Sequence, residues 1–342
     1  EIAEQIQFFE GVTITGERIK SVRDIYNEHI IDFIPLINNE ILVLTRTARN
    51  KKYNIVLLAF DTTYFDFDIQ LKNPQSFFVD CFKNLHIKTK DSVFQFIFTD
   101  TIEIVSALDL FDFEKQIEPC VWNGDSSLLY QYFTNHNRDM QLFQLSRHHK
   151  PNLIYEITDP KGAVAAQDYL QEIIAKYNMR VPSSENIIKL GLWSGDVMEL
   201  NIDGELNRMT SWYKKFQAKK LHTPCIELWN RVYLFDTENM EVIQFNRKLQ
   251  VENKTPLNIS FKPKRIELLK DEGTGKLYFY DMTNATISIY HYDLDSGTSK
   301  EVIEVHELTF PQKIKIVNGW MYFLSVKGFG FYKLYKVKLE DV

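Results

Sequence analysis

The feature of this chain that most constrains its fold is a strongly apolar or aromatic run that recurs along its length. The runs follow short polar turns and recur about every 47 residues on average. They begin at Ile41, Val93, Leu128, Ile187, Val232, Leu277 and Met321. Propeller blades of four strands span about 40–50 residues, so this period is typical of one blade.

Each run is followed, after a short gap, by a second β-like run. These partners begin at Ile55, Ile102, Met140, Val197, Glu241, Ile287 and Phe331. The gaps hold Gly, Asn and Asp, which tolerate the positive φ of hairpin turns. An apolar strand precedes most pairs, as at Asp32 to Ile37, and a fourth strand follows most of them. The pattern predicts an all-β chain, a single β-propeller domain over residues 1–342. Seven four-stranded blades are favoured, and six is the alternative because the repeat at Ile187 lacks a good preceding strand.

Two segments depart from this repeat. Residues 160–178 read as an amphipathic helix inserted between the third and fourth repeats, with Asp159 as its cap and Val164 and Leu170 on its apolar face. The last repeat ends at Val342 without an obvious fourth strand. The alternating segment from Gly11 to Thr15 is therefore predicted to complete the last blade.

Charge and hydropathy exclude some partners. The net charge is -6, so a globally basic footprint for nucleic acid is absent and no nucleic-acid partner is expected. No apolar run reaches the roughly 18 residues that a membrane-spanning helix needs, so no transmembrane segment is expected.

The cysteines and short motifs point to structure rather than to chemistry. Cys81, Cys120 and Cys225 are far from any CxxC spacing, so no zinc site, other metal or cofactor is expected. Three buried free thiols are favoured, and one disulfide is the alternative. The segment Gly124 to Ser127 resembles the GDS block of one esterase and lipase group, but no histidine follows an aspartate at the spacing of that group's catalytic pair. The segment is predicted to be a hairpin turn, as are Gly273 to Gly275 and Asp293 to Gly297.

Three stretches near the C-terminus carry a family resemblance. Residues Lys270 to Asp281, Tyr290 to Gly297 and Pro311 to Ser325 resemble the blades of uncharacterised bacterial propeller proteins, many of them secreted or lipid-anchored. The resemblance covers roughly the last third of the chain. It implies a periplasmic or cell-surface location, with a lipid anchor on a removed N-terminus as one form. It carries over no catalytic residue.

These observations favour a binding or scaffolding propeller of the bacterial cell envelope, holding a glycan, a peptide or an envelope protein on its loops. The alternative is a carbohydrate-active or hydrolytic enzyme with carboxylates at the central channel. Candidate ligand-binding residues form a basic set on the turns between second and third strands, where the inserted helix would share a face with them. The set consists of Arg46, Arg49, Lys51, Lys52, His136, Arg138 and Lys327.

Overall fold

A computed structural model describes most of the chain. The described residues are 12–14, 19–159, 164, 168 and 221–339, apart from gaps at 24, 26–27, 37, 50, 60–61, 99–100, 125, 135–137, 147–149, 260–266, 283–284 and 328–329. The repeat predicted at Ile187 and Val197 lies outside them. So does the predicted helix 160–178, except for Val164 and Asp168, which are both helical and exposed.

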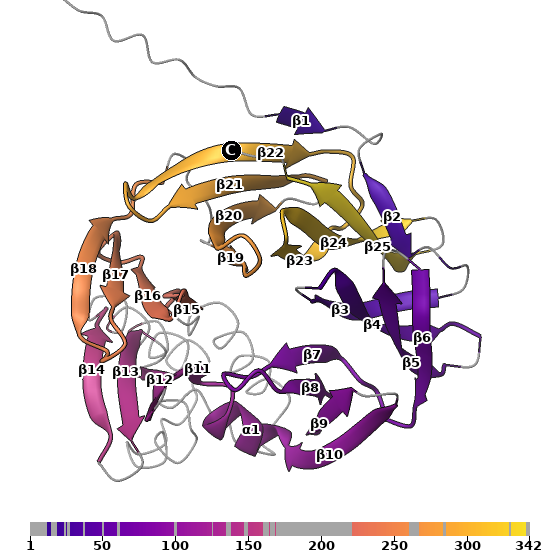
Figure 1. Cartoon of the computed structure of the whole chain (residues 1–342), viewed down its shortest axis with the longest axis horizontal. Coiled ribbons are helices and arrows are strands. Elements are labelled where there is room, and N and C mark those ends of the chain that lie inside the picture. Colours follow the sequence, from indigo (N-terminus) through magenta and orange to yellow (C-terminus); the bar gives the residue numbers. More distant parts are fainter. Residues whose placement is uncertain are drawn as a thin grey trace, which may run out of the picture. The chain divides into compact units, whose positions relative to one another are not determined.

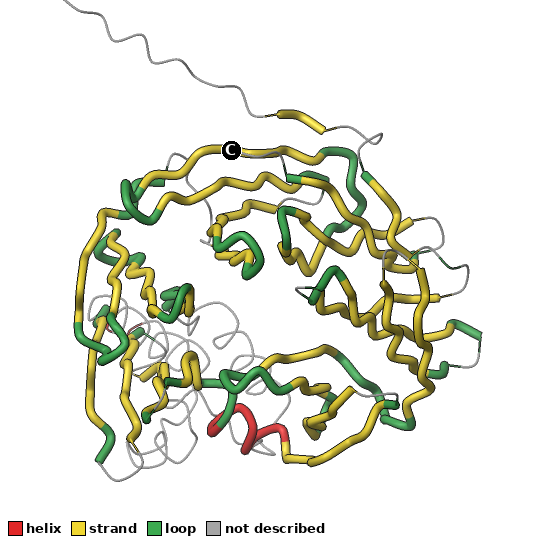
Figure 2. The backbone as a smooth tube through the Cα atoms, in the orientation of Figure 1, coloured by secondary structure: helices red, strands yellow, loops and turns green. Residues whose placement is uncertain are grey.

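The regular elements of the described chain are almost all strands (Figure 2). They form six sheets of four antiparallel strands each, and one sheet carries an added edge strand. In five sheets the four strands pair in chain order, and in the sixth the fourth strand comes from the N-terminal part of the chain. Sequential pairing of four antiparallel strands is the topology of a propeller blade. The chain is therefore a β-propeller, as predicted, and six blades are described, the lower of the two predicted counts.

Contacts divide the chain into two compact units, residues 1–118 with 255–342, and residues 119–254. The single domain expected over residues 1–342 stays a prediction. The first unit holds four sheets, which follow one another in Figure 1. Their strands are β19 (Glu267–Asp271), β20 (Lys276–Met282), β21 (Ile287–Asp293) and β22 (Thr298–Val305); β23 (Gln312–Val317), β24 (Trp320–Lys327), β25 (Phe331–Lys338) and β2 (Lys20–Arg23); β3 (Glu28–Pro35), β4 (Glu40–Thr47), β5 (Tyr53–Ala59) and β6 (Thr62–Ile69); β7 (Ser76–Val79), β8 (Leu85–Lys88), β9 (Ser92–Phe98) and β10 (Ile102–Asp109).

The second unit holds two sheets. Their strands are β11 (Cys120–Asn123), β12 (Ser127–Thr134), β13 (Asp139–Ser146) and β14 (Asn152–Ile157); β15 (Cys225–Leu228), β16 (Arg231–Asp236), β17 (Glu241–Phe245) and β18 (Val251–Pro256). In both units the first strands of neighbouring sheets contact each other, as β11 contacts β15. The first strand of each sheet is thus its inner strand.

The apolar runs are continuous because both faces of a blade are covered by neighbouring blades. Along β4, Ile41 and Val43 pack into a core shared with the β23–β25 sheet. Leu42 and Leu44, on the other face of the same strand, pack into a core shared with the β7–β10 sheet. Alternate residues of one strand therefore serve two cores, and the strand needs apolar residues at every position.

The N-terminus completes the last sheet, but with a different strand from the predicted one. Lys20–Arg23 forms β2, which pairs antiparallel with β25. The predicted segment instead supplies β1 (Val12–Ile14), which pairs in parallel with β22 at the edge of the preceding sheet. The alternation of the predicted segment identified a strand but not its partner.

The second repeat was assigned to the wrong place in its blade. The run at Val93 and its partner at Ile102 do pair as a hairpin, but they are the third and fourth strands, β9 and β10. The inner strands β7 and β8 have four residues each. The apolar segment from Phe77 to Phe82 covers the end of β7 and part of the turn that leads to β8. The short helix α1 (Leu110–Gln116), which was not predicted, follows β10 and is capped by Asp109.

The favoured prediction of three free thiols is wrong for two of the cysteines. Cys81 and Cys120 are disulfide-bonded, whereas Cys225 is free. Cys81 follows β7 and Cys120 begins β11, so the prediction failed because sequence spacing does not show which residues the fold brings together.

Candidate functional site

The predicted basic residues are only partly brought together. Arg46 lies in β4, Arg49, Lys51 and Lys52 lie in the β4–β5 turn, and Lys327 ends β24; all belong to the first unit. Arg138 belongs to the second unit, where it forms an ion pair with Asp159 (3.4 Å). His136 lies outside the described residues.

The inner strands of the first unit carry a buried charged group. Asp32 of β3 is only 3% exposed and accepts hydrogen bonds from the backbone N–H groups of Phe33 (2.9 Å) and Phe77 (2.8 Å). Two lysines of β23 face it, Lys313 at 3.3 Å and Lys315 at 3.9 Å. Burial lowers the pKa of Lys315, while Asp32 opposes that change. The carboxylate is fully engaged in joining three inner strands, so it is not available as a catalytic acid or base.

The inner hairpin turns of this unit also join one another. Asn318 donates to the side-chain oxygen of Asn39 (3.0 Å), and Lys83 forms an ion pair with Glu272 (3.5 Å). Asp271 accepts hydrogen bonds from the turn at Asn318 and Gly319 (2.8 and 2.7 Å). These contacts connect the turns to each other, which is a structural role.

The motifs weighed from the sequence form turns. The N–H of Gly124 donates to the carbonyl of Ser127 (2.9 Å) between β11 and β12. Gly273 to Gly275 form the β19–β20 turn, and Asp293 caps the β21–β22 turn by accepting from the N–H of Asp295 (2.9 Å). The predicted turns are confirmed.

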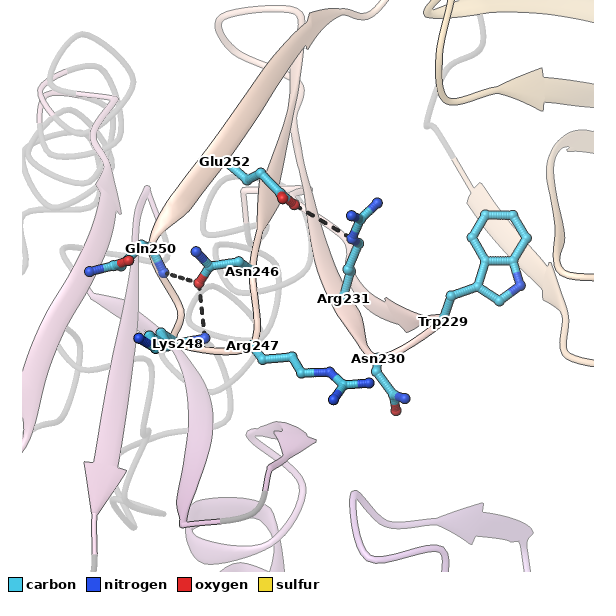
Figure 3. Close-up of a pocket in the computed structure, with 8 residues that line it drawn as sticks. All are labelled: Trp229, Asn230, Arg231, Asn246, Arg247, Lys248, Gln250 and Glu252. Carbon is cyan, nitrogen blue, oxygen red and sulfur yellow. Dashed lines mark hydrogen bonds and ion pairs between the residues drawn. The ribbon is translucent and has the colours of Figure 1, made fainter.

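A pocket of about 580 Å³ opens in the second unit, on the sheet β15–β18. It lies where the β15–β16 turn meets the β17–β18 turn (Figure 3). Its lining residues are Trp229, Asn230, Arg231, Asn246, Arg247, Lys248, Gln250 and Glu252.

The β15–β16 turn presents an aromatic ring in a costly backbone conformation. Leu228 pairs with Arg231, leaving a two-residue loop in which Trp229 and Asn230 both have positive φ (52° and 58°). This conformation suits Asn and Gly, and a bulky residue rarely adopts it. The Trp229 side chain is nevertheless 66% exposed, so core packing does not explain why a tryptophan stands there.

The β17–β18 turn is held rigidly around Asn246. The side-chain oxygen of Asn246 accepts from the N–H groups of Lys248 (2.9 Å) and Gln250 (3.1 Å). Leu249, 2% exposed, anchors the turn in the core of this unit. Arg247 therefore projects from a fixed backbone, and Figure 3 shows it extending toward Asn230.

The electrostatics of the pocket favour an anion. Glu252 is the single acid among the lining residues, and it pairs with Arg231 (3.5 Å) and accepts from Gln244. Arg247 and Lys248 are exposed and form no ion pair with any residue that the structure describes. Two cations are therefore left for a ligand.

Sequence reasoning missed this pocket. The sequence pattern predicts the strands on either side of Trp229 and Asn230 but assigns no role to the turn between them. A tryptophan between two strand runs, in a two-residue turn that should hold Asn or Gly, was the available signal.

Among the described residues, no group of three or more His, Cys, Asp and Glu side chains is placed to hold a metal ion. Within the same residues, no helix is long and apolar enough to cross a membrane.

Comparisons with known proteins add no assignment. No family model and no curated protein matches the chain. Similar solved structures include a luciferin-regenerating enzyme, with 9% identity over 94% of this chain and 94% of that chain and a TM-score of 0.37. A gluconolactonase from Xanthomonas campestris has 8% identity over 94% and 89% and a TM-score of 0.35. Hsv2 from Kluyveromyces lactis has 7% identity over 87% and 72% and a TM-score of 0.34. Such low scores carry no argument, so the fold class rests on the sheet topology.

Proposed function

We propose that this chain is a binding propeller of the bacterial cell envelope whose β15–β18 pocket takes an acidic saccharide. The observation that carries the proposal is the exposed indole of Trp229 beside the cations Arg247 and Lys248. An indole offers a flat apolar face on which the C–H face of a sugar ring can stack. Guanidinium and ammonium groups form charge-assisted hydrogen bonds with the carboxylate or sulfate of such a sugar.

The rigidity of the two turns supports a binding role. Asn246 holds one turn through its hydrogen bonds, and the other is a two-residue hairpin loop. Binding to a turn whose backbone is already ordered costs less conformational entropy than binding to a turn that the ligand must order.

The disulfide supports a location in the periplasm or at the cell surface. Cys81 and Cys120 are bonded, and disulfides persist mainly in oxidising compartments. A secreted or lipid-anchored form is part of the same proposal.

The alternative of a carbohydrate-active enzyme has less support. Hydrolysis by the usual route uses two carboxyl groups on either side of the bond that breaks. The pocket has one, Glu252, which is already paired, and the buried carboxylate of Asp32 is engaged by two backbone N–H groups.

Binding to polygalacturonate and to neutral dextran tests the proposal. The acidic polymer should bind and dextran should not, and added salt should weaken binding because it screens charges. Trp229→Ala and Arg247→Ala should each weaken binding about tenfold, the equivalent of about 1.4 kcal/mol. The matched controls are Phe310→Ala, which removes another exposed aromatic ring at positive φ, and Lys72→Ala, which removes an exposed cation elsewhere.

Three results would count against the proposal. Equal binding to dextran would show that recognition does not depend on an acidic group of the ligand. Unchanged binding by Trp229→Ala would place the site elsewhere and favour a peptide or protein partner. Release of new reducing ends from the polymer would show hydrolysis and favour the alternative of a carbohydrate-active enzyme.

A further inference from the structure

We propose a second site, independent of the pocket, in which Arg46 and His29 bind a tetrahedral oxyanion such as the phosphate or sulfate group of a ligand. It lies on the sheet β3–β6 of the first unit. One of its residues belongs to the predicted basic set, and the other was not singled out from the sequence.

The strand register places the two side chains together. Arg46 of β4 is directly opposite His29 of β3 and also opposite Tyr53 of β5. Directly opposite residues of antiparallel strands point to the same face, with Cβ atoms about 4.5–5.5 Å apart. A guanidinium, an imidazole and a phenol therefore stand in a row across three strands.

The guanidinium of Arg46 has an unused buried donor. Its Nε is buried without a hydrogen-bond partner among the described residues, and no carboxylate among them forms an ion pair with Arg46. An unsatisfied buried donor costs about 1–3 kcal/mol, and such groups are rare in folded proteins. By contrast, Arg23 at the end of β2 is paired at both its Nε and an outer nitrogen with Glu28 (2.5 and 2.8 Å).

His29 is oriented to donate a second hydrogen bond. Its Nδ1 accepts from the backbone N–H of Tyr332 (3.3 Å), so Nε2 carries the proton of the neutral ring. The ring packs against Phe331 and Tyr332, at centroid distances of 6.1 and 5.6 Å. These contacts fix the imidazole beside Arg46.

The surrounding field is positive and suits an anion. Burial lowers the pKa of His29, and the charges of Arg46 and Lys333 lower it further. The ammonium of Lys333 is held by the carbonyls of Ile25 and Glu28, so this positive charge is fixed in place. A planar guanidinium binds two oxygens of a phosphate at once, which a single ammonium does not do.

Titration with inorganic phosphate and with sulfate, at constant ionic strength, tests the site. Isothermal calorimetry measures affinity, and the imidazole resonances of His29 report the place of binding. We expect saturable binding and a rise in the pKa of His29, because the bound anion favours the charged ring. Arg46→Gln should weaken binding about tenfold or more. Arg49→Gln removes the same charge from the exposed β4–β5 turn and should change affinity by less than about twofold.

Arg46→Lys is a second variant for the case in which Arg46→Gln fails to fold. It keeps the positive charge but loses the planar group that can hold two oxygens, so it should bind phosphate more weakly than the wild type. Absence of saturable binding in the wild-type protein would overturn the proposal. Equal losses in Arg46→Gln and Arg49→Gln would also overturn it, since they would show diffuse attraction to a basic surface. If the wild-type protein binds phosphate but not polygalacturonate, the result supports the Arg46 and His29 site and contradicts only the saccharide pocket.

Discussion

At the scale of the residue, single buried aspartates hold several turns of this protein. Asp80, Asp236 and Asp271 are each 6% exposed or less, and each accepts hydrogen bonds from backbone N–H groups of the turn that follows it. A carboxylate that satisfies several donors is costly to replace, because the donors it leaves behind stay buried. These aspartates are structural.

Asp80 gives a pH-dependent prediction. It accepts from the N–H groups of Phe82 and Asn84, from the Asn84 side chain and from Nε2 of His86 (2.8–3.0 Å). Burial acts to raise the pKa of Asp80, but the hydrogen bonds from His86 and Asn84 outweigh it and lower the pKa below its ordinary value. A lowered folded-state pKa adds stability above the unfolded pKa, and this is lost as the pH falls through the folded one.

Asp80→Asn should therefore lower the free energy of unfolding by about 1–3 kcal/mol at pH 7, and less as the solution becomes strongly acid. Urea unfolding at pH 7 and at pH 3 measures the difference. Asp295→Asn makes the same change of charge at an exposed position and should have little effect. A loss of stability in Asp80→Asn that is the same at both pH values would contradict this account.

At the scale of the element, the N-terminal strands differ in importance. β2 forms the fourth strand of the last sheet, whereas β1 only adds to a sheet that already has four strands. An unpaired edge exposes backbone donors and acceptors and invites association between molecules. β2 is therefore the strand on which the last sheet depends.

Deletion of residues 1–15 should leave thermal stability and solubility nearly unchanged, whereas deletion of residues 1–23 should expose the edge of β25 and cause aggregation. Thermal scans with light scattering measure both effects. Equal behaviour of the two truncated proteins would show that β2 does not stabilise the last sheet.

At the scale of the whole molecule, the disulfide makes the stability of the chain depend on whether its compartment is oxidising or reducing. Burial raises the pKa of the Cys225 thiol to about 12, so little reactive thiolate forms near neutral pH. Cys81 and Cys120 are bonded and do not titrate. Redox conditions therefore act through these two cysteines.

Protein purified from an oxidising compartment should show one free thiol per chain when unfolded without reductant, and three after reduction. Cys120→Ser should lower the free energy of unfolding by about 2–4 kcal/mol, while Cys225→Ala should lower it less. A thiol assay and thermal unfolding measure these outcomes. Three free thiols in the oxidised protein would disprove the disulfide and weaken the proposed envelope location.

The class of fold follows from local features of the sequence. A blade buries both faces of its strands, so its apolar runs recur with the period of the blade, and local turn chemistry marks the hairpins. Ile41 to Leu44 and the Asp293 to Gly297 turn were readable for this reason, because each depends on residues close in the chain.

Which strands and side chains become neighbours depends on the folded arrangement of the chain. The residues of β2 show little apolar periodicity. They form a strand because they pair with the open edge of β25, which lies more than 300 residues away in the chain. Strand register placed Arg46 beside His29, and the meeting of two turns placed Arg247 beside Asn230. Such contacts depend on register and on which strands become neighbours, and no periodicity within a segment specifies them.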